Sequence, residues 1–465
     1  MRRVLLCLFI ATSTLMAGCL GGGEGIVSDE RAAPIFDDYV MIDEAGHGDA
    51  REFITIDLRT NETTNTTWAV FNKDYGGNCC EHYIATTIEG DIMNIGGEYP
   101  VYTEDRGHQW TTYTPGIIPD TQCRTFVPTN SGQEGLGEGS IVQATNGDII
   151  SMSWFPYIGA DGKIDKFYAI LYDDSEEEWS WCYNRITEPF YDRSWQVEVV
   201  GPISSSLGSG EWASIVVSNF WHQTQNAGGQ ISVDGLNYYP FQFPNRGGGD
   251  PTIELDLNFT EAGLPAYYDV NKPHKEMRSF PFPSGGLLFP NYYDNGNAAY
   301  MDTTLSWNEL EVQFPSEYCQ IDSTGSIHCM KNTGTDFTHF ISYDGANSWQ
   351  NYTYQMGNVS TSIEEWEFQA NGELDLFVLN IRYQSSEGPD VDMIYHVRGY
   401  SEDMSPDTLT YIGAGDLDST SGAGNDIRFD FASLAILSDG GVVVAFHDST
   451  DADPLFAVEL ELPQY

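Results

Sequence analysis

The sequence predicts an all-β protein, a β-propeller whose four-stranded blades surround a common centre. Three observations predict this fold: aromatic residues are abundant, a glycine-centred turn recurs, and an aspartate-centred turn alternates with it. Of 465 residues, 27 are Tyr, 24 are Phe and 11 are Trp, residue types that favour strands over helices. No long helical periodicity interrupts the pattern, so we expect strands throughout.

The glycine-centred turns have the order polar, Gly, polar, aliphatic. Each lies between β-rich runs, which predicts a hairpin between two neighbouring strands. The copies occupy residues 89–92, 146–149, 324–327, 371–374 and 439–442, with a looser one at 284–287.

The aspartate-centred turns follow the pattern Ser/Thr-x-Asp-x-Gly-x-x-Trp. The carboxylate is expected to accept hydrogen bonds from turn amides while the aromatic ring packs between strands, so these aspartates are structural. The two best copies pair Asp105 with Trp110 and Asp344 with Trp349, the latter with Ala346 where Gly is usual. Weaker copies pair Asp174 with Trp179, Asp234 with Tyr239, and Asp302 with Trp307, and Asp403 with Thr408 is an eroded candidate.

The alternation of the two turns predicts blades in which the glycine turn joins strands one and two and the aspartate turn joins strands three and four. The predicted blades lie near residues 80–115, 138–200, 208–245, 283–315, 317–355, 364–412 and 430–462. Seven blades are favoured, and six are the alternative because residues 208–315 are irregular. The last blade lacks a clear fourth strand, which residues 52–57 or 66–71 could supply to close the ring.

The aspartate turns resemble the Asp boxes, or BNR repeats, of sialidase-like propellers, from about residue 80 onward. The resemblance implies the fold without fixing a function, because sialidases, other glycoside hydrolases, receptors and assembly factors share these turns. A sialidase would need three arginines for a carboxylate, a Tyr–Glu nucleophile and an acid/base Asp. The catalytic candidates are Arg124, Arg382, Arg428, Tyr383, Tyr293 and Asp294. The Arg-Ile-Pro motif of sialidases is missing, and Arg185-Ile186-Thr187 is its nearest relative.

Both kinds of turn should lie on one face of the propeller, so a ligand would be met by the loops that join strands two and three on the other face. Aromatic or polar side chains there could contact a sugar, or could instead pack between blades or under loops. The ligand-binding candidates are Trp154, Tyr157, Tyr292, Tyr293, Tyr383 and His447.

The N-terminus predicts export. Arg2 and Arg3 precede an apolar stretch at 4–16, and residues 15–19 resemble a lipobox that ends in Cys19. We therefore expect a lipoprotein-type signal peptide at 1–18, the lipid anchor Cys19 with a flexible tether over 19–50, and one propeller domain over 51–465. The protein would sit on the extracellular face of the cell membrane, or be secreted if the signal is an ordinary one cut near Ala17.

Charge and cysteine usage agree with export. The 69 acidic residues outnumber 20 basic ones, for a net charge of −49, which repels nucleic acid and is similar to the composition of secreted proteins from halophilic or marine archaea. Six cysteines remain after the signal and anchor, and a Cys319–Cys329 disulfide across one hairpin is the best pairing. The pairing of Cys79, Cys80, Cys123 and Cys182 stays open. Sequons, the first at Asn61, are compatible with glycosylation.

No cofactor is expected, and the nine histidines show no metal-ligand spacing. Two acidic groups could hold calcium or could be solvated loops: Asp416, Asp418 and Asp426, or Asp448, Asp451 and Asp453. The favoured function is non-catalytic binding of a glycan or cell-surface protein, and a sialidase-like glycoside hydrolase acting on extracellular polysaccharide is the alternative. The oligomeric state is not predicted.

Overall fold

Strands are the only regular elements that the described part of the chain contains. The computed structural model describes residues 49–72, 83–86, 92–95, 101–104, 106, 111–112, 139–154, 164–176, 178–190, 192–219, 229–241, 244, 279–282, 285–322, 324–332, 336–355, 362–384, 391–400, 404, 406–414, 433–447 and 454–459. None of these residues belongs to a helix with the length and apolarity to cross a membrane. The predicted all-β class is therefore confirmed for this part of the chain.

Five separate antiparallel sheets have four strands each, in chain order. The first contains β3 (Tyr83–Thr86), β4 (Ile92–Ile95), β5 (Val101–Thr103) and β6 (Thr111–Thr112). The second contains β7 (Gly139–Gln143), β8 (Ile149–Trp154), β9 (Ile164–Asp173) and β10 (Glu178–Phe190). The third contains β11 (Asp192–Ser205), β12 (Gly208–Asn219), β13 (Gly229–Ser232) and β14 (Tyr239–Phe241). The fourth contains β15 (Phe280–Pro281), β16 (Leu287–Phe289), β17 (Ala298–Met301) and β18 (Trp307–Leu310). The fifth contains β19 (Tyr318–Ile321), β20 (Ile327–Asn332), β21 (Asp336–Ser342) and β22 (Gln350–Gln355).

The remaining nine strands form one continuous sheet in the order β23-β24-β25-β26-β1-β2-β29-β28-β27. Their bounds are β1 (Asp49–Asp57), β2 (Thr63–Asn72), β23 (Ser362–Asn371), β24 (Leu376–Gln384), β25 (Val391–Arg398), β26 (Thr408–Ala414), β27 (Ser433–Ile436), β28 (Val442–His447) and β29 (Pro454–Glu459). The predicted count of seven or six separate blades is thus corrected to five separate four-stranded blades and this larger sheet. The physical reason is β1, which pairs with both β26 and β2 and so joins strands that would otherwise form separate edges.

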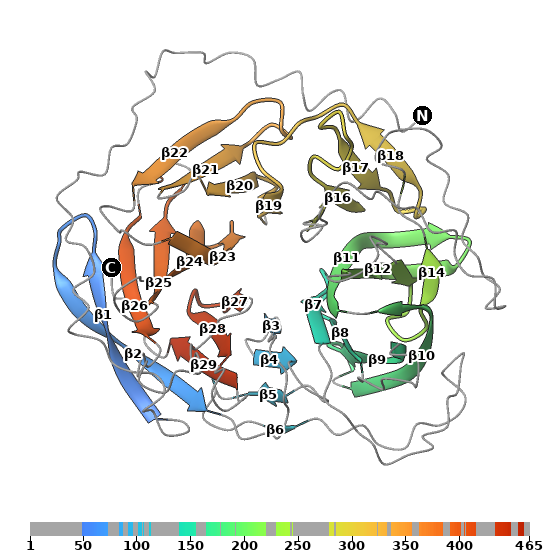
Figure 1. Cartoon of the computed structure of the whole chain (residues 1–465), viewed down its shortest axis with the longest axis horizontal. Coiled ribbons are helices and arrows are strands. Elements are labelled where there is room, and N and C mark those ends of the chain that lie inside the picture. Colours follow the sequence, from blue (N-terminus) through green and yellow to red (C-terminus); the bar gives the residue numbers. More distant parts are fainter. Residues whose placement is uncertain are drawn as a thin grey trace.

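The sheets form a ring around a common centre, as in a propeller (Figure 1). The strands nearest the centre each contact the next one around the ring, in the order β3, β7, β11, β15, β19, β23, β27 and back to β3. Because neighbouring strands are antiparallel, the turns that join strands one and two and strands three and four lie at the same edge of every sheet. We call this side of the ring the turn face, and the opposite side the loop face.

The glycine turns have the predicted position. Residues 146–149 join β7 to β8, and residues 324–327 join β19 to β20. Gly147 and Gly325 have φ values of 101° and 87°, a left-handed conformation that glycine adopts without steric cost. The sequence pattern therefore located these hairpins for a sound physical reason.

The ring closes through the N-terminal part of the chain. Of the two segments considered for this role, residues 66–71 are the closing strand, because β2 pairs with β29 from Trp68 to Asn72. Residues 52–57 belong to β1, which pairs with β26 instead.

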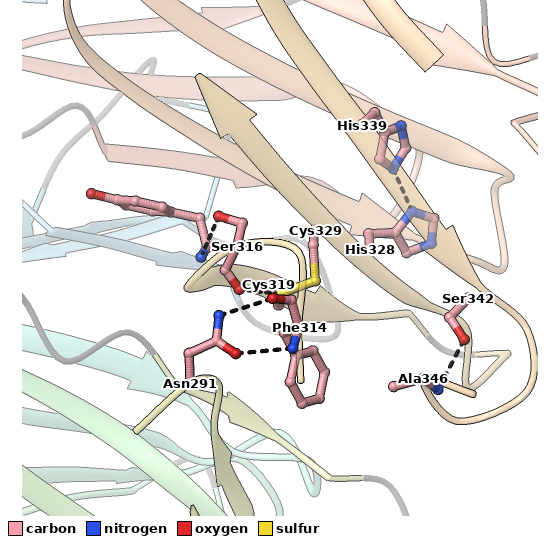
Figure 2. The surroundings of a disulfide bond; sticks show 10 residues. Asn291, Phe314, Ser316, Cys319, His328, Cys329, His339, Ser342 and Ala346 are labelled. Carbon is pink, nitrogen blue, oxygen red and sulfur yellow. Dashed lines mark hydrogen bonds between the residues drawn. A yellow bond between two sulfur atoms is a disulfide. The ribbon is translucent and has the colours of Figure 1, made fainter. Parts of the chain in front are cut away.

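Apolar side chains between neighbouring sheets make up the core. One cluster contains Val199, Ile215, Phe289, Met301 and Trp307 and so joins the third and fourth sheets. The predicted Cys319–Cys329 disulfide joins directly paired residues of β19 and β20 (Figure 2). Cys182 is also disulfide-bonded, and the cysteines with which it could pair lie outside the described residues.

Candidate functional site

The ends of second strands bring several of the predicted site residues to the loop face. Trp154 is the last residue of β8, His447 is the last residue of β28, and Tyr383 is the last but one of β24. Since the second strand of each sheet runs away from the turn face, all three residues lie at the loop-face edge of their sheets. The second strand is next to the innermost one, so this edge is close to the centre of the ring (Figure 1).

Arg382 has carboxylate residues on both neighbouring strands. In the register of the sheet it is opposite Glu365 of β23 and opposite Asp392 of β25. Directly paired residues share one face of a sheet, so these three positions alternate in charge along one line across the blade. Tyr383 follows Arg382 and therefore belongs to the other face of the same sheet.

Tyr292 and Tyr293 belong to the loop between β16 and β17, and both side chains are buried. Their exposed fractions are 7% and 6%, and both belong to the apolar cluster between the third and fourth sheets. The Tyr292 ring stacks on Trp307, with ring centroids 6.4 Å apart, and meets Tyr293 edge to face. Burial, and secondly the nearby Glu309 carboxylate, raise the pKa of Tyr293, which opposes its use as a nucleophile. Both rings thus pack under a loop, the alternative role considered for them.

The same loop fixes the connections on both sides of its sheet. The Tyr292 hydroxyl donates to the carbonyl of Pro244, at 2.7 Å, in the connection from the third sheet. The Asn291 side chain bonds both backbone groups of Phe314, at 2.9 Å each, in the connection to the fifth sheet (Figure 2). Asp294 lies exposed at the loop-face end of this blade. Hydrogen bonds from two adjacent residues at the start of the loop therefore tie it to the connections on both sides of its sheet.

Aspartates of the turn face are occupied by their own turns. Asp302 Oδ1 accepts from the backbone amides of Thr304 and Ser306, at 2.9 and 3.1 Å. Asp344 Oδ1 accepts from the amide of Ser348 at 2.9 Å. Burial raises the pKa of both carboxyls, but the hydrogen bonds outweigh it and hold each pKa below its usual range. These groups are ionised turn acceptors, which leaves them poorly suited to proton transfer.

Asp234 repeats this geometry between β13 and β14, where its Oδ1 accepts from the amides of Leu236 and Asn237 at 2.9 and 2.7 Å. Trp307 is buried, and Tyr239, Trp179 and Trp349 are partly buried against core clusters.

The turn between β9 and β10 differs from the prediction. The carboxylate that accepts the turn amides is that of Asp173, with Ser175 and Glu176 as donors at 3.0 and 3.1 Å. Asp174 instead donates its backbone amide to Asp148 Oδ1 at 3.1 Å. The motif placed the structural aspartate one residue late because two aspartates are adjacent.

A buried network of titratable groups was not predicted. Asp322 Oδ2 lies 2.8 Å from His328 Nε2 and accepts a 2.7 Å hydrogen bond from the Tyr400 hydroxyl. His328 Nδ1 lies 2.9 Å from His339 Nε2 (Figure 2). The strand alternation Phe337, His339, Ile341 carries the missed signal, because it places a histidine on the core face of β21.

Burial determines the charge states of this network. Burial raises the pKa of Asp322, but hydrogen bonds from His328, Thr324 and Tyr400 outweigh it, so the pKa falls far below its usual range. Burial, and secondly the neighbouring His328, hold the pKa of His339 well below its usual range, so that ring is neutral near pH 7. His328 and His339 are completely buried, so the network is a structural joint without access for a substrate.

Several predicted residues lie outside the described part of the chain: Cys19, Asp105, Trp110, Arg124, Tyr157, Asp403, Arg428 and the six aspartates considered for calcium. Within the described ranges, no group of three or more His, Cys, Asp or Glu side chains is arranged to hold a metal ion.

No protein-family model and no curated protein sequence matches this chain. Among solved structures, the chain is similar to the sialidase NanB of Streptococcus pneumoniae, in complex with Optactamide, at 14% identity and a TM-score of 0.33, over 89% of this chain and 68% of that one. It is also similar to the α-L-arabinofuranosidase Arb93A of Fusarium graminearum, at 10% identity and a TM-score of 0.35, over 72% and 96% of the two chains. The α-L-arabinanase of Penicillium chrysogenum matches at 11% identity and a TM-score of 0.31, over 72% and 93%. Likenesses this distant bring no activity to this chain.

Proposed function

We propose that this protein is a non-catalytic propeller module that binds a glycan through its loop face. One observation carries the proposal: second strands from separate parts of the chain end at this face with Trp154, Tyr383 and His447. Aromatic residues at these strand ends are of the types whose rings suit the apolar faces of sugars. On the turn face, by contrast, the carboxylates of Asp234, Asp302 and Asp344 are already bonded to backbone amides.

A glycan microarray with the labelled protein tests this proposal. We expect Trp154→Ala and Tyr383→Ala to lower binding of the captured glycan at least tenfold. The matched control is Tyr343→Ala, because Tyr343 is 47% exposed in a turn between β21 and β22, on the turn face. Binding that survives both loop-face substitutions, or that is lost in the control, would contradict the proposal.

A glycoside hydrolase is the second candidate, and the two acidic residues that pair with Arg382 on the neighbouring strands favour it. Glu365 and Asp392 occupy register positions on either side of Arg382 at the loop-face end of the blade. Two carboxylates are the minimum equipment for glycosidic bond cleavage. Release of chromophore from a panel of chromogenic glycosides, abolished by Glu365→Gln and unchanged by the turn-face substitution Glu373→Gln, would establish hydrolysis. No release from any glycoside would favour binding alone.

We also propose that Cys19 carries a lipid and holds the domain at the extracellular face of the membrane. The support is the small-residue run before Cys19, the preceding apolar stretch and the two arginines at positions 2 and 3. Cys19→Ser should move the protein from the membrane fraction to the medium. Retention of the variant in the membrane fraction would refute the anchor.

A further inference from the structure

The N-terminal hairpin of β1 and β2 lies between two groups of strands that are far apart in the sequence. β1 pairs with β2 over eight residues, from Asp49 to Ile56, and with β26 over three, from Thr55 to Asp57. β2 pairs in turn with β29 over five residues. The hairpin is therefore paired on one side with residues 408–410 of β26 and on the other with residues 455–459 of β29.

A chain of buried hydroxyl groups connects β26, β1 and β2. Thr55 Oγ1 lies 2.8 Å from Thr66 Oγ1 on β2 and 2.9 Å from Thr410 Oγ1 on β26. The Trp68 indole donates to Thr66 Oγ1 at 3.0 Å. All of these side chains are buried, so each hydroxyl relies on the next for its hydrogen bond.

Apolar side chains of the hairpin fill the space between the two groups. Phe53 and Trp68 meet edge to face with ring centroids 6.1 Å apart. The cluster around them takes side chains from both sides of the junction: Leu376, Val378 and Ile412 from the β23–β26 group, and Leu434, Val442 and Val444 from β27 and β28. The core shared by the two groups thus depends on rings that the hairpin supplies.

The tip of the hairpin is fixed to one of the groups by polar contacts. The Leu58 amide donates to the Asp407 carbonyl at 2.7 Å, and Arg59 Nε lies 2.5 Å from Asp407 Oδ1. Leu58 is buried in the cluster that contains Phe377 and Tyr400. Both the tip and the middle of the hairpin therefore hold the β23–β26 group.

We propose that the β1–β2 hairpin is a strap that couples the β23–β26 group to the β27–β29 group, so that the two groups detach from the hairpin and reattach to it together. The strap goes beyond glycan binding, because it sets whether the ring that carries the loop face stays closed. When the strap detaches, the ring opens between β26 and β29. In this proposal, loosening the pairing of β1 with β26 also loosens the pairing of β2 with β29.

Hydrogen–deuterium exchange on the whole domain tests the coupling. Thr55→Val removes the central hydroxyl at constant shape, and Arg59→Ala removes the ion pair at the half-exposed tip without touching the core. We expect each variant to speed amide exchange at least tenfold in peptides covering residues 408–414 and 454–459 together. The matched control is Thr338→Val, which removes one hydroxyl of the 3.1 Å Thr338–Thr353 pair between β21 and β22.

The control should leave both strap-bound peptides unchanged. Faster exchange confined to residues 49–57 would overturn the proposal, because β1 would then be a frayed edge that couples nothing. Faster exchange in 408–414 with 454–459 unchanged in both strap variants would also overturn it. If Thr55→Val does not fold, the Arg59→Ala result alone decides.

Discussion

The buried carboxylate of Asp322 allows a sharp test of how the turn face is stabilised. Its Oδ1 accepts from the amides of Thr324 and Ser326, each at 2.9 Å, and from the Thr324 hydroxyl at 2.6 Å. Its Oδ2 is hydrogen-bonded to His328 Nε2 and accepts a hydrogen bond from the Tyr400 hydroxyl. Asp322→Asn keeps the shape of the side chain but replaces one acceptor oxygen by a donor NH₂ group. Backbone amides cannot turn away, so the NH₂ must face His328 and Tyr400.

The size of the effect follows from those two bonds. A hydrogen bond to a charged group contributes about 1.5–3 kcal/mol, and His328 can partly recover by switching its tautomer. We therefore expect Asp322→Asn to lower the free energy of unfolding by about 2–4 kcal/mol. The same substitution at exposed Asp344 breaks a similar turn pattern in contact with water, where screening limits the loss to under about 1 kcal/mol.

Urea unfolding at pH 7 and constant salt compares the two variants through their midpoints. The pKa of Asp322 is depressed, so its contribution is complete above the ordinary aspartate pKa and is lost as pH falls toward the folded-state value. The gap between wild type and Asp322→Asn should accordingly narrow below about pH 4. Equal losses for Asp322→Asn and Asp344→Asn would refute the reasoning, because burial would then have no effect.

Three further variants give independent outcomes. Burial raises the pKa of Glu459 to about 8, so the free energy of unfolding falls as pH rises from the ordinary glutamate range through 8 and the carboxyl loses its proton. Glu459→Gln should therefore be more stable than wild type in thermal unfolding at pH 8, with no gain near pH 4.5. Replacing Cys319 and Cys329 by Ala opens a loop with a sequence separation of 10, which should cost about 2–3 kcal/mol in guanidinium unfolding, and an unchanged midpoint would contradict this. Trp212→Phe removes the 2.9 Å indole bond to Asp148 Oδ2 between two sheets, for an expected loss of about 1–3 kcal/mol, which a urea midpoint equal to wild type would rule out.

The sequence predicted local turn conformations because these depend on only a few neighbouring residues. The turns at Gly147 and Gly325 need left-handed backbone, which the sequence signals with glycine. The same logic failed at 371–374, where the left-handed residue is Asp375, with φ of 47°, rather than Gly372. Asp can adopt this conformation, so the position of Gly alone did not fix the turn.

The pairing of strands far apart in the chain was harder to predict from the sequence. The β-rich segment at residues 52–57 predicts a strand, but nothing local indicates that this strand pairs with β26, more than 350 residues away in the chain. That single pairing turned the expected separate blades into a nine-stranded sheet. Likewise, the aromatic run at Tyr292 and Tyr293 looked like a binding surface, and only the neighbouring sheets show that both rings are enclosed.

The direction of β1 determines on which side of the ring the preceding part of the chain joins the domain. Asp57 pairs with Thr408 just after a turn-face connection, so the strand runs toward the turn face and Asp49 begins at the loop face. Under the proposed attachment at Cys19, the polypeptide that precedes Asp49 would join the domain at the loop face, the same side that is proposed to bind the glycan. The proposed binding side would then also be the side of attachment, which favours polymers that lie close to the envelope over those approaching from outside.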